Sequence, residues 1–329
     1  MITFIFTWDY EIYGNGVGCL RDLVYEPTRI LAEVFRKHNC KFVVFAEANE
    51  LQQIDERKTD PKIECVKDQL RKLYEEGFEI GLHLHPQWCR AKYDGTWQLD
   101  YGEYNLCTLS RNRICEIVDQ SINYLRTVLR DKAFTPLSFR AGNWLFQPSY
   151  PASSVLTERG VRIDSSVFKG GVRHSHNLDY RRSLRNRAPY WRFSDDVQEM
   201  DTEGAMIEIP IYSEMVPPWK MFGRKRVRLE RAAVTTKHSI RQSLDRLRDM
   251  ARMQQPLKFD CCRLSLLEQK EFVKRLIARH RSDSERIMPV VVIGHSKELV
   301  DIEAIESLLM TLSDVDVKIS LFREIVDSL

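Results

Sequence analysis

The 329-residue sequence contains no apolar run long enough to cross a lipid bilayer. Its longest apolar stretches, at 42–46 and 289–294, fall far short of the ~18 residues that a membrane-spanning helix needs. It also lacks internal repeats and low-complexity segments, and 43% of its residues are hydrophobic and 29% charged. These values exclude a disordered or collagen-like chain. The sequence therefore predicts a folded globular protein.

A secretory signal is also missing from the start of the sequence. Met1 leads directly into Thr3-Phe4-Ile5-Phe6, without a basic stretch and a following apolar segment, so we expect a cytoplasmic protein. The eight cysteines have irregular spacing and form no C-x-x-C pair. In that compartment we expect reduced thiols and not a disulfide framework. We assign no role to the adjacent Cys261 and Cys262.

What the chain does contain is an alternation of short apolar runs and longer amphipathic ones. The apolar runs predict strands at 2–7, 41–46, 78–84, 137–139, 161–163, 206–211, 290–293 and 317–319. The amphipathic segments predict helices at 28–38, 63–76, 111–130, 153–159 and 266–281, with two more after residue 301. We expect Gly77 and Gly160 to end two of these helices. Strand-then-helix order predicts an α/β fold with a parallel sheet, and the length suits a closed (β/α) barrel.

The positive charge of the chain is concentrated in one segment. The formal net charge is +3, but residues 220–252 hold eleven Lys or Arg against three acids, a local excess of eight positive charges. We predict one barrel domain over 1–329 with an irregular basic insertion at about 168–262. An anionic substrate carrier or a membrane surface, contacted through 220–252, is the partner that this charge predicts. Nucleic acid is not favoured, because no nucleic-acid-binding motif accompanies the cations.

Ionisable residues follow five of the predicted strands. Asp9 and Glu11 come after the first strand, His83 and His85 end the third, and single residues follow three others: Arg140, Asp164 and His295. The carboxyl ends of parallel strands meet at one end of a sheet or barrel, where substrates bind. We therefore expect these side chains to surround one site.

Two of these segments carry a pair of ionisable residues at alternate positions. His83 and His85 share a face of a strand about 6.6 Å apart along it, so both imidazoles can reach one metal ion. Taken alone, such a pair is more often a pair of surface residues, or a buried histidine whose ring nitrogens are hydrogen-bonded within the protein. Asp9 and Glu11 can divide base and ligand roles in the same way, the alternative being a simple loop with a helix cap.

The fourth predicted strand is followed by a cation, small residues and a ring. Arg140-Ala141-Gly142-Asn143-Trp144 permits close backbone approach at Ala141 and Gly142, and Asp164 is the expected carboxylate partner of Arg140. Trp8, Trp88 and Trp144 lie in or beside the strand ends. They suit either sugar stacking or packing of the barrel rim.

One further motif is excluded. Gly294-His295-Ser296 is no nucleophile elbow, since Glu298 stands where the last glycine belongs. His295 is better explained as a group that titrates near neutral pH.

Together, five short motifs resemble those of the NodB-type polysaccharide deacetylases, carbohydrate esterase family 4. They span Thr7 to Glu11, Phe78 to His83, Ser138 to Trp144, Ile163 to Ser166 and Ile293 to Ser296, and the resemblance covers 1–165 and 287–329. The Asp-Tyr-Glu, His-Leu-His-Pro and Gly-His-Ser-Lys-Glu-Leu variants resemble a bacterial subgroup associated with cell-surface glycan biosynthesis. The resemblance implies a distorted (β/α) barrel of about seven strands, the NodB-like deacetylase fold.

The resemblance also implies a role for each site residue. Asp9 matches the general base, Arg140 the arginine that orients it, Asp164 its supporting acid and His295 the general acid. Tyr10 stands where the family has a ligand aspartate, so Glu11 is the implied substitute. His83 matches the first ligand histidine. Gln87 stands at the position of the second, so His85 is the candidate in its place, and the choice between them stays open.

The activity implied is removal of the N-acetyl group from an amino sugar in a glycan or glycan precursor, with release of acetate. The implied cofactor is a divalent metal ion, Zn²⁺ first and Co²⁺ or Mn²⁺ as alternatives, and Trp8, Trp88, Asn143 and Trp144 are the candidate substrate contacts. A sugar on a lipid-phosphate or nucleotide carrier would suit a cytoplasmic enzyme. Two alternatives remain: a hydrolase of non-sugar C–N bonds, and a glycan-binding protein with a weakened site, which Tyr10 and Gln87 favour.

Overall fold

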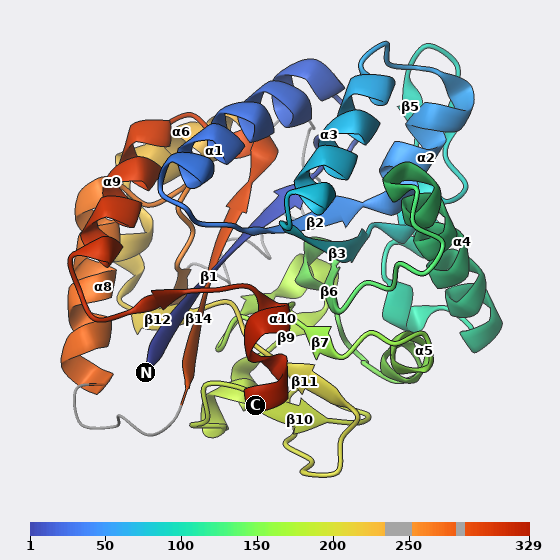
Figure 1. The fold of residues 1–329 in the computed structure, drawn as a ribbon. Coiled ribbons are helices and arrows are strands. Elements are labelled where there is room, and N and C mark those ends of the chain that lie inside the picture. The colour runs from blue at the N-terminus through green and yellow to red at the C-terminus, as the bar shows by residue number, and fades with distance from the viewer. Residues whose placement is uncertain (234–251, 281–286) are drawn as a thin grey trace.

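The computed structural model describes residues 1–233, 252–280 and 287–329. In this part of the chain the main sheet has nine strands, and seven of them form a continuous row of parallel pairs (Figure 1). In spatial order these are β14 (Met288–His295), β1 (Ile2–Tyr10), β2 (Val43–Glu47), β3 (Glu79–Leu84), β6 (Ser138–Ala141), β7 (Ile163–Asp164) and β11 (Met206–Glu208). The seven-stranded distorted barrel expected from the sequence is the fold observed.

Isolated bridges, not a regular strand pair, close the barrel. Past the end of β11 the chain crosses from β7 to β14, so that Ile211 bridges both Phe168 and Val291. The Tyr212 backbone N–H donates to the Val291 carbonyl at 3.0 Å, and Asp260 makes a further bridge to Ile293. The wall between β11 and β14 is therefore irregular, which is the distortion of the barrel.

Shorter strands extend or flank this ring. β10 (Trp191–Phe193) adds to β11 in the antiparallel sense, and β15 (Lys318–Ile319) pairs with β1. The described residues also form three two-stranded ribbons: β4 (Lys92–Tyr93) with β5 (Trp97–Gln98), β8 (Val172–Arg173) with β9 (Leu178–Asp179), and β12 (Ser213–Val216) with β13 (Gln255–Lys258).

Helices surround the sheet (Figure 1). They are α1 (Glu26–Lys37), α2 (Ala48–Arg57), α3 (Ile63–Glu75), α4 (Arg111–Leu129), α5 (Ala152–Glu158), α6 (Arg224–Ala233), α8 (Leu266–His280), α9 (Ile302–Ser313) and α10 (Phe322–Ile325). In α4 the Ser110 hydroxyl caps the Arg113 N–H, and Ile114, Val118 and Leu125 are buried on the face toward the sheet. The apolar stripe therefore decides which side of α4 covers the barrel.

The two faces of β1 show how the sequence separates core from site. Phe6 and Trp8 point outward, where Phe35 of α1 packs edge-on against both rings. Thr7 and Asp9 alternate with them and point into the barrel, where both contact one arginine. Side chains along a strand alternate between faces, so one strand supplies both apolar packing and polar chemistry.

The predicted elements match the observed ones to within a few residues at most ends. Gly77 and Gly160 lie just past α3 and α5, and both have positive φ, at 83° and 86°. A residue with a Cβ is strained in that conformation, so each glycine ends its helix as predicted. The sequence pattern missed α2, the β4–β5 ribbon and the strands between 168 and 262 other than β11.

The basic insertion is described only in part. Residues 168–233 and 252–262 carry β8 to β13 and α6, whereas 234–251, which hold several of the cations counted above, lie outside the described residues. All eight cysteines are free thiols. Among the described helices, none combines the length and the apolarity that a bilayer crossing demands.

Candidate active site

A fully buried arginine connects three strands inside the barrel. Arg140 of β6 donates to Asp9 Oδ1 at 2.6 Å and to Thr7 Oγ1 at 2.9 Å, both on β1. Its Nε donates to the Ser165 carbonyl at 2.9 Å, next to β7. A guanidinium presents its donors in a fixed fork, so Asp9 is held in one orientation.

Asp9 is the carboxylate that pairs with Arg140, and the expected Arg140–Asp164 pair is wrong. Asp164 accepts from the Ser166 hydroxyl at 2.6 Å and lies in register with Glu208 on β11. The Ser165 carbonyl and the two β1 side chains already take the donors of Arg140 on this side. Burial raises the pKa of both Asp164 and Glu208, so these neighbours are disposed to share a proton.

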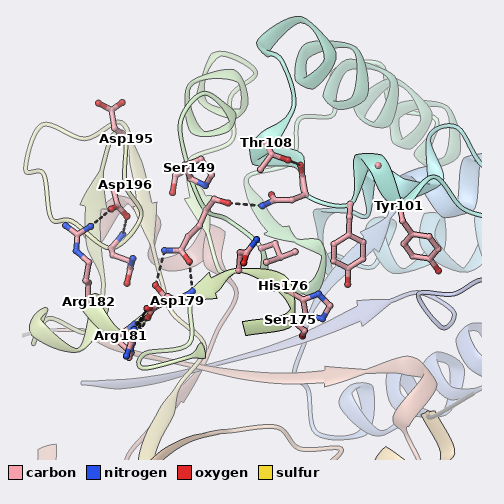
Figure 2. Close-up of a pocket in the computed structure, with 18 of the residues that line it drawn as sticks. Tyr101, Thr108, Ser149, Ser175, His176, Asp179, Arg181, Arg182, Asp195 and Asp196 are labelled. Carbon is pink, nitrogen blue, oxygen red and sulfur yellow. Dashed lines mark hydrogen bonds and ion pairs between the residues drawn. The ribbon is translucent and has the colours of Figure 1, made fainter. Parts of the chain in front are cut away.

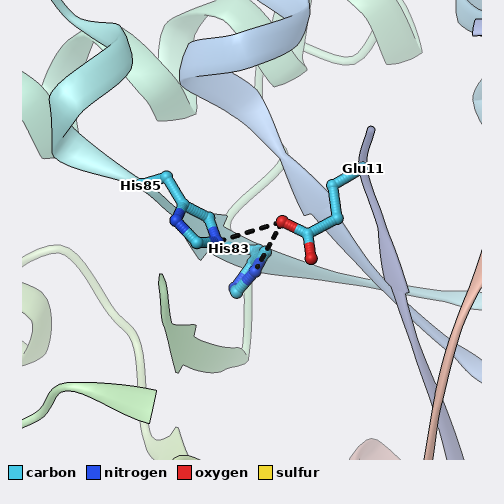
Figure 3. Close-up of side chains that lie close together, drawn as sticks. All are labelled: Glu11, His83 and His85. Atoms are coloured by element: carbon cyan, nitrogen blue, oxygen red, sulfur yellow. Dashed lines mark ion pairs between the residues drawn. The ribbon is translucent and has the colours of Figure 1, made fainter. Parts of the chain in front are cut away.

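Glu11, His83 and His85 bring three ligand-type atoms together at the carboxyl ends of β1 and β3 (Figure 3). Glu11 Oε2 lies 3.0 Å from His85 Nε2 and 3.5 Å from His83 Nε2. Ligand atoms of one tetrahedral zinc ion are ~3.4 Å apart, given bonds of ~2.1 Å. All three residues are buried. The spacing and the donor set therefore fit one divalent metal ion.

Two of these atoms also have unmet bonding capacity. Within the described chain, Glu11 Oε2 and His83 Nε2 are buried without a hydrogen-bond partner. The other ring nitrogen of His83 lies 2.8 Å from the Arg140 carbonyl. A carbonyl can only accept, so Nδ1 of His83 carries the proton and Nε2 presents a lone pair. This is the arrangement of a metal-binding histidine.

Gln87 lies behind the ring of His85, with its amide nitrogen 3.1 Å from His85 Nδ1. Its Oε1 is buried and has no partner among the described residues. Amide oxygen and nitrogen exchange places when the group turns over, and the bonding network decides the orientation. In either orientation Gln87 contacts Nδ1 of His85, and Nε2 of the ring faces Glu11. The structure thus brings His85, and not Gln87, next to Glu11.

The charge of Glu11 is fixed by a lysine that the sequence reasoning missed. Lys297 Nζ lies 2.7 Å from Glu11 Oε1, on the oxygen that points away from the histidines. Burial favours the neutral acid, but the Lys297 ammonium and His85 hold the pKa of Glu11 well below its usual range. The strand-end rule gave no hint of Lys297, because it lies two residues beyond the end of β14.

Glu47 is a second residue that was missed. It ends β2, where the same rule could have found it, and its carboxylate accepts from the His85 backbone N–H at 2.7 Å. Burial and the neighbouring Glu50 raise the pKa of Glu47 well above its usual range. This side chain positions the turn that carries His85.

His295 ends β14 beside Asp9. Its Nε2 lies 3.3 Å from Asp9 Oδ2, and the Trp144 ring meets the imidazole edge-on at 5.9 Å. Burial lowers the pKa of His295, while Asp9 and Glu298 raise it. For Asp9, burial raises the pKa but Arg140, His83 and His295 bring it below its usual value. Asp9 is therefore ionised, with Oδ2 directed toward a ring nitrogen that can carry a proton.

The structure divides the predicted substrate contacts into two groups. Trp144 borders His295, and the Asn143 side-chain amide lies 3.4 Å from His85 Nδ1. The stacking role expected for Trp8 and Trp88 is wrong, because both side chains are buried away from the site. Trp8 is on the helix side of β1, and Trp88 packs against Trp97 at 4.9 Å.

A polar cavity of about 1130 Å³ is lined by residues that include Tyr101, Ser149 and Asp179 (Figure 2). Leu145 forms part of its wall, directly after Trp144 in the chain. Tyr101 and Tyr104 stand on one side, and Tyr104 stacks on His176 at 5.3 Å. Aromatic faces beside polar groups suit a ring-shaped polar ligand.

Solved structures share this fold, although the sequence itself finds no counterpart. No family model and no curated protein sequence matches the chain. A protein from Mycobacterium smegmatis assigned as a polysaccharide deacetylase has a TM-score of 0.56 at 12% identity, over 99% of this chain and 89% of its own. The PuuE allantoinase has a TM-score of 0.54 at 11% identity, over 98% and 88% of the two chains.

A third similar structure has a different chemistry. The 4-alpha-glucanotransferase from Thermococcus litoralis has a TM-score of 0.55 at 12% identity, over 100% of this chain and 40% of its own. The polysaccharide-deacetylase-like fold expected from the motifs is thus shown, and proteins with that fold have more than one activity.

Proposed function

We propose that this protein is a metal-dependent deacetylase that hydrolyses the N-acetyl group of an amino sugar and releases acetate. The observation that carries the proposal is one buried constellation: the ligand-type cluster of Glu11, His83 and His85 next to the Asp9–Arg140 pair and His295. Hydrolysis of an amide needs an electrophile for its carbonyl, a base for water and an acid for the departing nitrogen. The constellation offers a group for each.

Glu11, His83 and His85 would hold the metal, Zn²⁺ first and Co²⁺ or Mn²⁺ as alternatives. Such an ion, when bound, would polarise the amide carbonyl and lower the pKa of water toward ~7. Other groups of the protein orient these three metal-ligand candidates. The Arg140 carbonyl orients His83, Gln87 lies behind His85, and Lys297 occupies the other oxygen of Glu11.

Asp9 acts as the general base. Arg140 occupies Oδ1, so Oδ2 is the oxygen that accepts the proton from the attacking water. Arg140 also keeps Asp9 ionised and prevents the carboxylate from turning. A base held in this way contributes ~10²–10⁴-fold to the rate.

His295 acts as the general acid and protonates the departing nitrogen through Nε2. The Trp144 ring on one side and Asp9 on the other hold the imidazole in place. As the C–N bond breaks, this proton makes the free amine of the sugar, and the acyl group leaves as acetate.

An N-acetylated sugar in a glycan or glycan precursor is the substrate class that we favour. The cavity with Tyr101 and Tyr104 next to the Trp144 turn has room for sugar units beyond the reacting one. The polysaccharide deacetylase assignment of a similar structure is consistent with this class. A lipid-phosphate or nucleotide carrier fits the cytoplasmic location expected from the sequence.

A second candidate is hydrolysis of a non-sugar C–N bond at the same site. The observation that favours it is the allantoinase, whose fold matches over 98% of this chain. Both candidates use the same base, acid and ligand cluster, so only the substrate separates them.

Metal analysis combined with an acetate-release assay tests the proposal. We expect the chelator-treated protein to rebind one Zn²⁺, Co²⁺ or Mn²⁺ and to release acetate from an N-acetylglucosamine oligosaccharide. Asp9→Asn should lower turnover by ~10²–10⁴-fold and leave metal content unchanged. Asp94→Asn, in an exposed turn, is the matched control.

Three other results would redirect the assignment. Metal binding with hydrolysis of allantoin-like cyclic amides alone, measured as the carboxylate that forms when the ring opens, would favour the second candidate. Glycan binding without metal uptake or turnover would indicate a binding protein. Full activity of Asp9→Asn would remove Asp9 as the base.

A further inference from the structure

Three large apolar side chains are exposed on the two segments that adjoin one end of the β12–β13 ribbon. Trp219 is 72% exposed, Phe222 60% and Met253 89%. We name these three residues the apolar tip. Side chains of this kind rarely stay in water as a group unless they contact something.

The backbone explains why residues distant in sequence meet there. β12 and β13 are antiparallel, with Val216 opposite Gln255 as the last pair. Beyond this pair, the segment that begins at Pro218 and the segment that contains Met253 adjoin the same end of the ribbon. The chain then turns through a short 3₁₀ helix, Pro218–Met221, which brings Trp219 and Phe222 to the same end.

Three cations that form no ion pair with a described residue accompany the tip. Lys220, Arg224 and Arg228 are exposed, and no ion pair of theirs occurs within the described residues. Two other cations of α6 do form ion pairs with the rest of the protein. Lys225 pairs with Asp301 at 3.1 Å, and Arg226 pairs with Glu268 at 2.8 Å. The helix is thus held by two cations while three others remain available to an external anion.

The tip also borders a pocket that extends toward the candidate active site. This pocket, about 250 Å³ in volume, has an apolar wall that includes Pro218, Phe222 and Leu257, and it reaches Lys258. Lys258 Nζ lies 3.2 Å from the centre of the Trp144 ring, which on its edge meets His295. A surface in contact with the tip is therefore connected to the site through one pocket.

We propose that the apolar tip and the cations Lys220, Arg224 and Arg228 dock this protein on a bilayer of anionic lipid. Trp and Phe occupy the boundary between headgroups and acyl chains, and exposed Lys and Arg pair with lipid phosphates. The combination of aromatic rings and unpaired cations favours this partner over an acidic protein, which would not need the rings, and over an apolar protein face, which would not need the cations.

Docking on a bilayer would also favour one kind of substrate, an inference that rests on the proposed function. A protein held by its tip directs the pocket and Trp144 toward the lipid, so it selects a sugar on a lipid-phosphate carrier over one on a nucleotide. The carrier phosphate would meet Lys258, and the start of its chain would lie along the apolar wall.

Vesicle co-sedimentation tests the docking without reference to activity. We expect the protein to pellet with vesicles of phosphatidylcholine and phosphatidylglycerol, and to pellet at least tenfold less with phosphatidylcholine alone or at high salt. Trp219→Ala/Met253→Ala and Lys220→Gln/Arg224→Gln/Arg228→Gln should each weaken vesicle binding at least tenfold. The matched controls are Tyr150→Ala/Met310→Ala and Lys72→Gln/Lys132→Gln/Lys318→Gln, at exposed positions elsewhere.

Two outcomes would overturn the docking: no pelleting with anionic vesicles, or equal loss in the tip variants and their controls. Acetate release separates this result from the proposed function. The tip variants should keep full turnover of a soluble oligosaccharide and lose turnover of a vesicle-embedded lipid-phosphate sugar. If neither substrate is hydrolysed but vesicles are bound, the docking stands and the proposed function fails.

Discussion

Gly142 is the point at which the backbone of β6 turns against the ring of His85. A Cβ at this position would lie 2.6 Å from the Leu84 carbonyl oxygen and 2.8 Å from the His85 ring. The small residues at 141 and 142 that the sequence analysis singled out therefore allow the close approach expected of them. The ring cannot keep its orientation if this space is filled.

Replacing Gly142 should consequently weaken metal binding. We expect Gly142→Ala to lower Zn²⁺ affinity about 10–100-fold, the usual cost of disturbing the groups that orient a ligand, as measured by competition with a chromophoric chelator. Gly14→Ala is the control, since a Cβ there meets nothing within 4 Å. Unchanged affinity in Gly142→Ala would mean that His85 is not a ligand.

Glu298 sets the protonation of His295. Burial lowers the pKa of the imidazole, and Asp9 and Glu298 act in the opposite direction. Glu298→Gln removes one of the two raising charges, so the pKa falls further and the doubly protonated ring is lost at lower pH. We expect the alkaline limb of log kcat/KM to move to lower pH, whereas Glu303→Gln, an exposed change, leaves the limb in place. A shift to higher pH would contradict the acid role.

The rule that functional residues follow the ends of parallel strands was sufficient to find most of the site residues. It did not predict which side chains form hydrogen bonds or ion pairs with them. The structure brings Asp9, Glu11, His83, His85 and His295 together, as the rule about parallel strands implies. Partners depend on which side chain fills which space, and this depends on contacts far apart in sequence. The Asp164 prediction failed for that reason, and Lys297 and Glu47 were missed.

Elements with a strong local pattern were predictable, and those that depend on distant chain were not. β1 and α4 carry unbroken apolar periodicity and were found with small end errors. α2 is rich in Glu and Gln and buries polar groups such as Asn49 and Glu50, so its pattern is weak. The ring closure at Ile211 consists of isolated bridges, which no local pattern encodes.

The two faces of β1 make a prediction about its tryptophan. Trp8 packs among Phe6, Phe35 and Phe42, so Trp8→Phe should lower the free energy of unfolding by about 1–3 kcal/mol and leave KM unchanged. Trp144→Phe should do the reverse, with a raised KM and little change in stability. Urea unfolding and substrate saturation curves measure the two effects, and a raised KM in Trp8→Phe would restore its stacking role.

At the scale of the whole molecule, the barrel buries several carboxylates whose pKa is raised. Burial and the charge of Glu11 raise the pKa of Glu50 to about 8, and burial also raises the pKa of Glu47, Glu79 and Glu208. A folded state that holds protons more tightly than the unfolded chain loses stability as pH rises. For Glu50 the loss begins near the unfolded pKa of 4.5 and is complete above about 8.

The metal-free protein should therefore be more stable at pH 5.5 than at pH 8. In the chelator-treated protein we expect Glu50→Gln to reduce this difference, because glutamine still accepts from the Ile12 N–H and never has to lose a proton. Urea unfolding at pH 5.5 and pH 8 measures the difference in the free energy of unfolding. Glu75→Gln, at an exposed position of α3, is the control. An undiminished pH dependence in Glu50→Gln would place the titration elsewhere.

The position of β1 between β2 and β14 has a consequence for how the protein is made. Glu11, His83 and His85 lie within the first 85 residues and leave the ribosome early. His295 emerges much later, with β14, which pairs along nearly the whole length of β1. During translation the three ligand-type residues are thus made long before His295, and under the proposed function a nascent chain should be without hydrolytic activity until β14 is in register.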